Sequence, residues 1–198
     1  MSLVTTRRSL HLLAERVISP LRVQETGNEI ALRPRPGGFG TYDLPGGGWA
    51  GVSGASVVRV GADGVERAAP ISSVAAAAEF VGLRGAVEDA ALPIEPAAAA
   101  LLAEVWAIGQ AALDRLLEVT GSGEPIHLWP EHFDVATVAG AVNYGVSPGD
   151  DAHDEPYAYV APWNVADPDD PRWNATGFRG AQAPVIDADQ VFSFFRSL

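Results

Sequence analysis

One long apolar stripe constrains the fold of this chain more than any other feature. Between Pro93 and Val119, apolar residues recur at the three- and four-residue spacing of a helix face, while Glu104 and Asp114 fall outside it. The stripe consists of Leu101, Leu102, Val105, Ile108, Ala112, Leu113, Leu116 and Leu117. Such a helix needs a broad apolar partner, so we expect it to pack across a sheet and to contribute core packing, not chemistry.

Short runs joined by turn residues predict the strands of that sheet. Ser56–Val60 and Val65–Ala69 are separated by a loop that ends in Asp63-Gly64, a strong hairpin signal. Further strand-like runs are Glu29–Arg33, His127–Val138, Ala141–Ser147 and Pro156–Pro162, and the glycine-rich stretch from Pro36 to Gly54 is expected to be a loop or an irregular ribbon. Because the connections are hairpins and not βαβ crossovers, we predict an α+β fold with one antiparallel sheet of about six or seven strands.

Three shorter helices are expected around this sheet. One covers Thr6–Ile18 and stops at Ser19-Pro20, one is capped by Ser72 or Ser73 and closed by Gly82, and the last is headed by Asp187 or Asp189. With 198 residues the chain can bury a core without staples, and no internal repeat is visible. We expect a single domain, in which residues 1–92 form a helix–strand–hairpin–helix scaffold part. Residues 93–198 would contribute the long helix, an acidic three-stranded part and the C-terminal helix.

Composition excludes several classes of chemistry and partner. The chain has no cysteine, and all 13 basic residues are arginine, which excludes disulfides, thiolate metal sites, cysteine nucleophiles and lysine chemistry. The net charge is −12; residues 1–99 carry 9 Arg against 10 acidic residues, and residues 100–198 carry 4 Arg against 15. An acidic chain without a basic patch is a poor partner for nucleic acid and for anionic lipid surfaces. We therefore expect no nucleic-acid partner.

The sequence also predicts a cytoplasmic location without a membrane partner. No run approaches the roughly 20 apolar residues of a membrane span. Near the N-terminus, the apolar stretch after Arg7-Arg8 is interrupted by Glu15 and is too short for a signal peptide.

Candidate functional residues concentrate between residues 127 and 179. This part holds Trp129, Trp163, Trp173, His127, His132 and His153. If Leu128–Val135 is a strand, His132 and Asp134 share one face about 7 Å apart, and Glu131 lies on the apolar face, where burial would raise its pKa. We therefore take Glu131, His132 and Asp134 as candidate catalytic residues. The structural alternative is that Glu131 points to solvent at a kink and that Asp134 orients or caps a neighbouring group.

The next two runs predict one hairpin with a polar–aromatic face. If Asn143 pairs with Ala161, then Gly145 faces Tyr159 and Ser147 faces Tyr157, and the opposite face, with Tyr144, Val146, Ala158 and Val160, is a core face. The polar–aromatic face is of a kind that lines a pocket or a subunit interface. The predicted ligand-binding residues are Asn143, Tyr157, Tyr159, Trp163 and Trp173, the two tryptophans serving as walls.

The loop from Pro148 to Glu155 is the densest cluster of carboxylate and imidazole groups in the chain. A divalent metal held by His132, Asp134 and His153 is one hypothesis for it. A solvated acidic loop is the alternative. An EF-hand is excluded, because the spacing from Asp150 lacks the glycine and the final glutamate of that loop. No other cofactor is indicated.

Three motifs resemble a family of uncharacterised actinobacterial proteins. They are Leu128-Trp129-Pro130-Glu131-His132-Phe133-Asp134, Val142-Asn143-Tyr144-Gly145-x-Ser147-Pro148-Gly149-Asp150 and Glu155-Pro156-Tyr157-x-Tyr159-Val160-x-Pro162-Trp163. The run from Leu32 to Thr41 is similar to that family as well. This resemblance implies a bacterial origin and a shared site without an assigned activity. It implies no substrate.

Two functional hypotheses follow. In the first, the chain binds a small molecule in a polar–aromatic pocket formed by residues 127–179. In an enzymatic version, His132 is the general base, Asp134 orients its ring, and Tyr157 or Tyr159 donates a proton to the substrate. In the second, the protein is not catalytic, and the same sheet face forms a homodimer or partner interface. Whether the protein is an enzyme stays open at this level.

Overall fold

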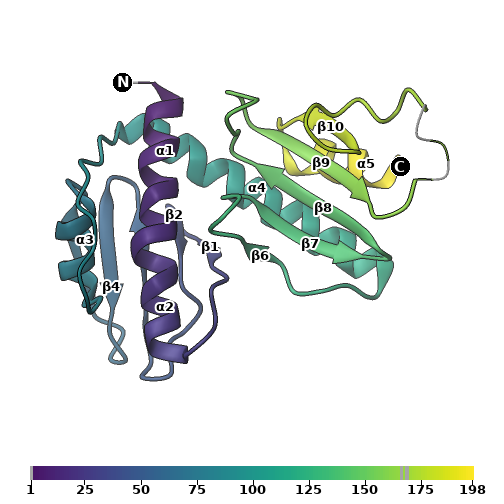
Figure 1. Cartoon of the computed structure of the whole chain (residues 1–198). Helices are drawn as coiled ribbons and strands as arrows, with labels where there is room; N and C mark the ends of the chain where they lie inside the picture. The colour runs from purple at the N-terminus through teal and green to yellow at the C-terminus, as the bar shows by residue number, and fades with distance from the viewer. Residues whose placement is uncertain (1, 166, 168–169) are drawn as a thin grey trace. The chain divides into compact units, whose positions relative to one another are not determined.

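The computed structural model describes residues 2–165, 167 and 170–198. The chain divides into two compact units: unit 1 contains Met1–Glu104 and Leu128–Phe133, and unit 2 contains Val105–His127 and Asp134–Leu198. Two five-stranded antiparallel sheets are present, each with its strands in sequential order (Figure 1). The α+β class and the long helix are confirmed, whereas the single sheet of six or seven strands is wrong. The expected single domain stays a prediction, because the division does not show that either unit folds alone.

Two strands of the unit 1 sheet, β2 (Gly38–Gly40) and β3 (Trp49–Ser53), lie in the glycine-rich stretch from Pro36 to Gly54 that was expected to be a loop or an irregular ribbon. The other strands of this sheet are β1 (Arg33–Arg35), β4 (Ser56–Val60) and β5 (Glu66–Pro70). The glycines allow close strand contact: a Cβ on Gly51 would overlap the carbonyl oxygen of Phe39. The predicted hairpin of β4 and β5 is confirmed, with Val57 opposite Ala69. The strand expected over residues 29–33 begins only at Arg33.

The first helix of unit 1 continues through Pro20. It consists of α1 (Leu3–Leu13), the π-helical segment η1 (Ala14–Ile18) and α2 (Ser19–Thr26). Proline usually stops a helix, because it lacks an N–H donor. Here the wider π turn, in which the Ser19 amide bonds the Ala14 carbonyl, lets Pro20 enter the first turn of α2. The predicted stop at Ser19-Pro20 is therefore wrong.

The short helix α3 (Val74–Val81) forms as its caps predict. The Ser73 side chain accepts a hydrogen bond from the Ala76 amide, and Gly82 ends the helix in the left-handed conformation with φ 80°.

A returning segment, Leu128–Phe133, completes unit 1. Leu128 exchanges two backbone hydrogen bonds of 2.9 Å with Leu32. The Phe133 ring is buried, stacks on His11 at 5.0 Å and meets Phe39 edge-on at 5.2 Å. His11 is thus a packing residue of the scaffold, and its Nε2 lies 2.8 Å from the Pro130 carbonyl oxygen.

Unit 2 is a sheet with helices on one face. The second sheet consists of β6 (His127–Leu128), β7 (Val135–Ala139), β8 (Val142–Ser147), β9 (Tyr157–Pro162) and β10 (Ala181–Pro184), and only Leu128 of these strands belongs to unit 1. The helices of unit 2 are the later part of α4 (Pro96–Thr120) and α5 (Ala188–Arg196). Gly109 of α4 packs against Val146 so closely that a Cβ there would lie 2.9 Å from the Val146 Cβ. The Tyr144 ring meets Phe195 of α5 at 5.6 Å. The predicted core face is therefore the face that the helices cover.

The strand expected over His127–Val138 is interrupted. β6 ends at Leu128, a turn occupies residues 130–132, and β7 begins at Val135. Pro130 cannot donate a ladder hydrogen bond, and Phe133 adopts a positive φ of 59°. Both features turn the chain, so the alternation of side chains assumed for Leu128–Val135 does not hold.

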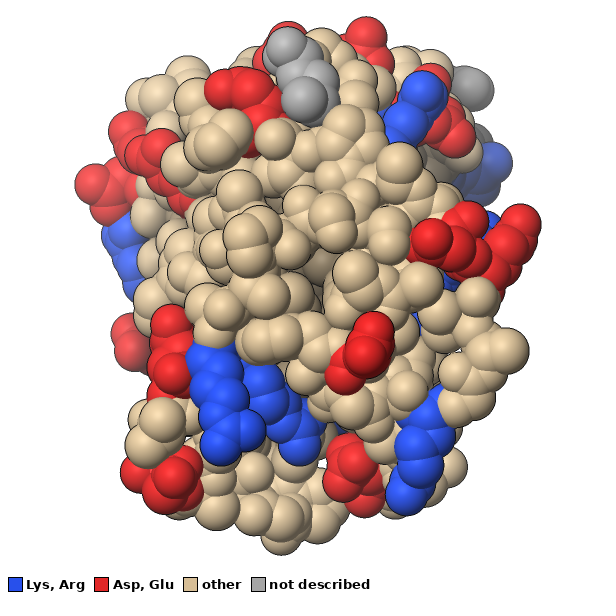
Figure 2. All heavy atoms as spheres, turned by 90° about the vertical axis from the view of Figure 1, so that its left-hand side faces the viewer, with Lys and Arg blue, Asp and Glu red and all other residues tan. Residues whose placement is uncertain are grey.

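Helix α4 alone among the described helices has the length and apolar character of a membrane span. The expectation that no segment approaches the length and hydrophobicity of a membrane span is therefore wrong for α4. Within the structure, however, Leu102, Trp106 and Leu113 of this helix are completely buried in protein, as in the core helix of a soluble fold. On the face shown in Figure 2, basic side chains are interspersed with acidic and uncharged ones, and some basic side chains adjoin one another at the lower left of centre.

Candidate functional site

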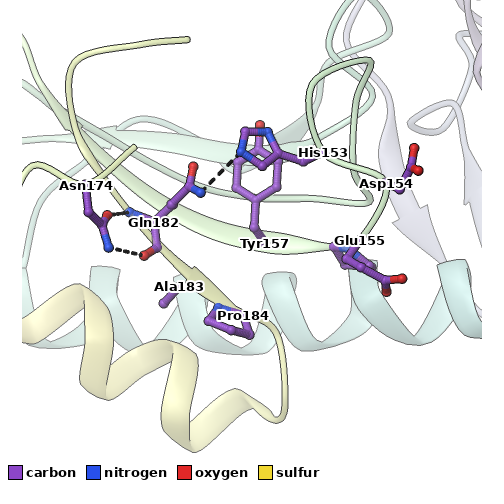
Figure 3. A pocket seen from close by; sticks show the side chains of 9 residues that line it. His153, Asp154, Glu155, Tyr157, Asn174, Gln182, Ala183 and Pro184 are labelled. Carbon is purple, nitrogen blue, oxygen red and sulfur yellow. Dashed lines mark hydrogen bonds between the residues drawn. The ribbon is translucent and has the colours of Figure 1, made fainter. Parts of the chain in front are cut away.

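The polar–aromatic face of unit 2 forms in the predicted register. Asn143 pairs with Ala161, Gly145 with Tyr159, and Ser147 with Tyr157. β10 extends this face, because Gln182 pairs with Tyr159. In Figure 3 the rings of His153 and Tyr157 lie on one side of the sheet, and α4 and α5 lie on the other. The candidate site is therefore on the face that these helices leave uncovered.

Tyr159 fills the gap that Gly145 leaves on this face. A Cβ on Gly145 would overlap Cζ of the Tyr159 ring, so the ring lies directly over the glycine. The Tyr159 hydroxyl donates a hydrogen bond to Oδ2 of Asp134, a buried carboxylate. Burial first, and then the charge and hydrogen bond of Asp134, raise the pKa of Tyr159 well above its ordinary value. Buried Asp134 and half-buried Tyr159 are thus a hydrogen-bonded pair and not an open pocket wall.

A second pair joins Tyr157, at the start of β9, to Asp150 in the preceding loop. The Tyr157 hydroxyl donates to Asp150 Oδ2 at 2.5 Å. Burial, followed by this hydrogen bond, raises the pKa of Tyr157 far above its ordinary value. Burial acts to raise the pKa of Asp150 too, but hydrogen bonds from Tyr157 and from the amides of Ala152 and His153 outweigh it, and the pKa of Asp150 is lowered.

His153 joins this pair to β10. Its ring lies 4.9 Å from the ring of Tyr157, and its Nδ1 lies 3.4 Å from Asp150 Oδ1. On its other side, Nε2 is 3.2 Å from Nε2 of Gln182. The tautomer that leaves Nε2 unprotonated accepts this hydrogen bond from the Gln182 amide. Asp150 is therefore a carboxylate beside His153 in this fold.

A pocket of about 450 Å³ opens beside these rings (Figure 3). It is lined by His153, Asp154, Glu155, Pro156, Tyr157, Asn174, Gln182, Ala183 and Pro184. Asn174 holds one wall, because its side chain accepts from the Gln182 amide at 2.8 Å and donates to the Gln182 carbonyl at 3.2 Å. Asp154 and Glu155 are exposed carboxylates, so the pocket combines an aromatic wall with negative charge.

The three predicted catalytic residues lie in different environments. Glu131 and His132 are exposed in the turn at residues 130–132, whereas Asp134 is buried and accepts a hydrogen bond from Tyr159. The premise for Glu131, a carboxylate forced against Trp129 and Phe133 on a strand, is wrong because the segment is not a strand. Glu131 is exposed at the turn, as the structural alternative predicted.

Of the remaining predicted site residues, some line the pocket and others lie outside it in unit 2. His153 and Tyr157 line the pocket, and Tyr159 supports it from below through Gly145 and Asp134. Trp163 is 61% exposed, and its indole lies 3.4 Å from Asn143 Oδ1. Trp173 donates to the carbonyl oxygen of Asp167 at 3.0 Å, and neither tryptophan belongs to the pocket lining.

The structure does not gather the residues of the proposed metal site. Within the described part of the chain, no group of three or more histidine and carboxylate side chains is arranged to hold a metal ion. His132 is exposed, Asp134 accepts a hydrogen bond from Tyr159, and His153 is engaged with Asp150 and Gln182.

Sequence reasoning missed the residues that come from β10 and from the loop before it. Gln182 and Asn174 build one wall of the pocket, and Phe178 packs edge-on against Tyr159 at 5.7 Å. The only sequence signal was weak: Gln182 stands between two alanines, Ala181 and Ala183, in an alternation too short to identify a strand.

Comparison with known proteins adds no assignment. The chain matches no protein-family model, no curated protein and no solved structure. The resemblance to an actinobacterial family therefore gains no support from these comparisons.

Proposed function

We propose that unit 2 binds a small molecule with a positively charged group, in the pocket between Tyr157 and Gln182. The observation that carries this proposal is the lining itself: two aromatic rings stand beside two exposed carboxylates, and none of the described lining residues is an arginine. A cation is attracted to an aromatic face and to carboxylates together. The two carboxylates would repel an anion there.

The supporting hydrogen bonds favour binding over catalysis. Tyr157 is held by Asp150, Gln182 by Asn174, and His153 lies between Asp150 and Gln182. Side chains locked in this way present a fixed surface, and fixed surfaces lose little entropy when a ligand binds. A general base, in contrast, needs a nitrogen directed at the substrate, and the Nε2 of His153 is directed at Gln182.

Benzylamine and benzoate test the sign of the charge, because they have similar size and opposite charge. We expect benzylamine to shift the NMR signals of the Tyr157 and His153 rings in a saturable way, and benzoate to leave them unchanged. Glu155→Gln should weaken benzylamine binding by about threefold to tenfold, because it removes one charge from the rim. Asp151→Asn is the matched control, since Asp151 is exposed in the same loop and does not line the pocket. Equal binding of benzoate, or equal loss in both variants, would contradict the proposal.

An exposed tryptophan supports a second candidate function, in which this sheet face contacts another copy of the chain. Trp163 follows β9 on the uncovered side beside Asn143, and 61% of its surface is exposed. Tryptophan is among the residues most enriched at protein interfaces. If this function holds, sedimentation will show a concentration-dependent dimer, and Trp163→Ser will return the protein to a monomer. A monomer at all concentrations would exclude the homodimer.

A further inference from the structure

A separate cluster of cations and aromatic rings lies in unit 1. The Arg22 guanidinium carbon lies 4.5 Å from the centre of the Tyr42 ring, and that of Arg33 lies 5.2 Å from the same ring. Arg35 stands 4.6 Å from the Trp49 ring. Three of the 13 arginines of a chain with net charge −12 therefore gather around β1 and the residues after β2.

Two of these arginines are fixed by the protein. The Arg22 side chain is 10% exposed, donates to the Ala31 carbonyl and lies 3.4 Å from Glu29 Oε2. The Arg35 side chain is 16% exposed and donates both to the Thr41 carbonyl at 2.8 Å and to Asp43 Oδ1 at 2.9 Å. Their positions are thus set before any ligand arrives.

Arg33 differs from both neighbours. It is exposed, and in the described part of the chain it forms neither an ion pair nor a hydrogen bond through its side chain, which instead contacts the Tyr42 ring. Arg33 and Arg35 alternate with Pro34 on β1, so their side chains leave the same face of the sheet. An exposed guanidinium beside two fixed ones creates a local positive potential that a single anion can neutralise.

We propose that Arg33, supported by Arg22 and the Tyr42 ring, binds an oxyanion: a phosphate or carboxylate group of a small molecule. The planar guanidinium presents paired N–H donors that match the two oxygens of either group. The ring of Tyr42 holds the Arg33 side chain by a cation–π contact, which reduces the freedom lost on binding. This site belongs to unit 1, and it does not depend on the proposed pocket of unit 2.

Titration with inorganic phosphate and with succinate tests this site at constant ionic strength. We expect saturable shifts of the arginine side-chain NMR signals, with the tighter of the two anions identifying the preferred group. Arg33→Gln should weaken binding at least about tenfold, because the fork of donors is lost. Arg84→Gln is the matched control: Arg84 is another exposed arginine of unit 1, and its loss changes the net charge equally.

Substitution of Arg33 by lysine distinguishes the effect of the paired N–H donors from the effect of the positive charge. Arg33→Lys should retain only part of the affinity, since lysine keeps the positive charge without the planar pair of donors. Circular dichroism of each variant confirms that it is folded, which is expected because Arg33 is exposed. Weak, unsaturable shifts for both anions, or equal weakening by Arg33→Gln and Arg84→Gln, would overturn the proposal.

Discussion

At the residue scale, the uncovered face of unit 2 depends on a glycine and a tyrosine from neighbouring strands. Tyr159 lies over Gly145 because glycine leaves room for the ring, and the ring in turn brings its hydroxyl to the buried Asp134. Tyr157, two residues earlier, then lies 6.3 Å from Tyr159 and forms the wall of the pocket. The absence of a side chain at Gly145 thus determines where the Tyr159 ring lies beside the pocket wall.

Gly145→Ala tests this dependence. The new methyl group would overlap the Tyr159 ring, which must move and loosen its bond to Asp134. We expect the free energy of unfolding to fall by about 2 kcal/mol, as for an overpacked core. Urea denaturation measures the change. Gly46→Ala is the control, because a Cβ at Gly46 meets no atom within 4 Å, and an equal loss in both variants would show that the ring contact is not the cause.

At the element scale, the close contact of α4 with β8 determines which face of the second sheet is covered. Gly109 is the position of closest approach, with its missing Cβ directed at Val146. The sequence pattern predicted α4 and its apolar stripe, but a glycine inside a helix by itself indicates only lower helix propensity. The role of Gly109 as a contact position is visible only in the structure, where Val146 of β8 packs against it.

Gly109→Ala should therefore reverse the usual effect of this substitution. In an open helix, alanine would stabilise by about 1 kcal/mol, but here its methyl group would lie 2.9 Å from the Val146 Cβ. We expect a net destabilisation of about 1 kcal/mol, which the double variant with Val146→Ala partly restores. Urea midpoints of the two single variants and the double variant give the coupling. Strictly additive effects would contradict a direct contact.

At the scale of the whole molecule, the two units have the same order of helices and strands, although the sequence contains no visible internal repeat. Each has a helix, then five antiparallel strands in sequential order, then a closing helix. The uncovered side of one sheet carries tyrosines and carboxylates, and the other unit carries the arginine cluster. The net charge of −12 is therefore divided into a strongly acidic part and a part with an accessible cation.

All four tyrosines of the protein should resist ionisation until unusually high pH. Burial, the largest cause in each case, raises the pKa of Tyr42, Tyr144, Tyr157 and Tyr159. The neutral form is thus favoured in the folded state. Its stabilising effect is fully present below the unfolded pKa of about 10 and is lost as the pH rises through the folded values.

Phenolate absorbance measures this in the native protein and in urea. The native titration should lie above the unfolded one, and stability should fall as the pH rises past about 10. Tyr157→Phe should remove one of the late-titrating groups. A native tyrosine that titrates at its ordinary pKa would contradict the prediction for that residue.

Local signals were sufficient for those parts of the fold that local chemistry controls. The Ser73 and Gly82 caps, the hairpin of β4 and β5, and the pairing of Gly145 with Tyr159 were all predicted, because turn residues, caps and alternation act over a few residues. The tertiary structure decided the rest. Phe133 packs against His11 and Phe39 and turns the chain with a positive φ, so His132 and Asp134 do not lie on one face of a continuous strand.

The sequence by itself determined the long helix α4, the capped helix α3, the hairpin of β4 and β5, the acidic balance and the strand face that carries Tyr157 and Tyr159. Which carboxylate meets which ring was decided only in three dimensions. Asp150 reaches Tyr157, and Asp134 reaches Tyr159 across 25 positions of the chain. Gln182 reaches His153 across 29 positions. Such partners are selected by packing of whole strands and loops, and the spacing of residues along the chain carries no record of that selection.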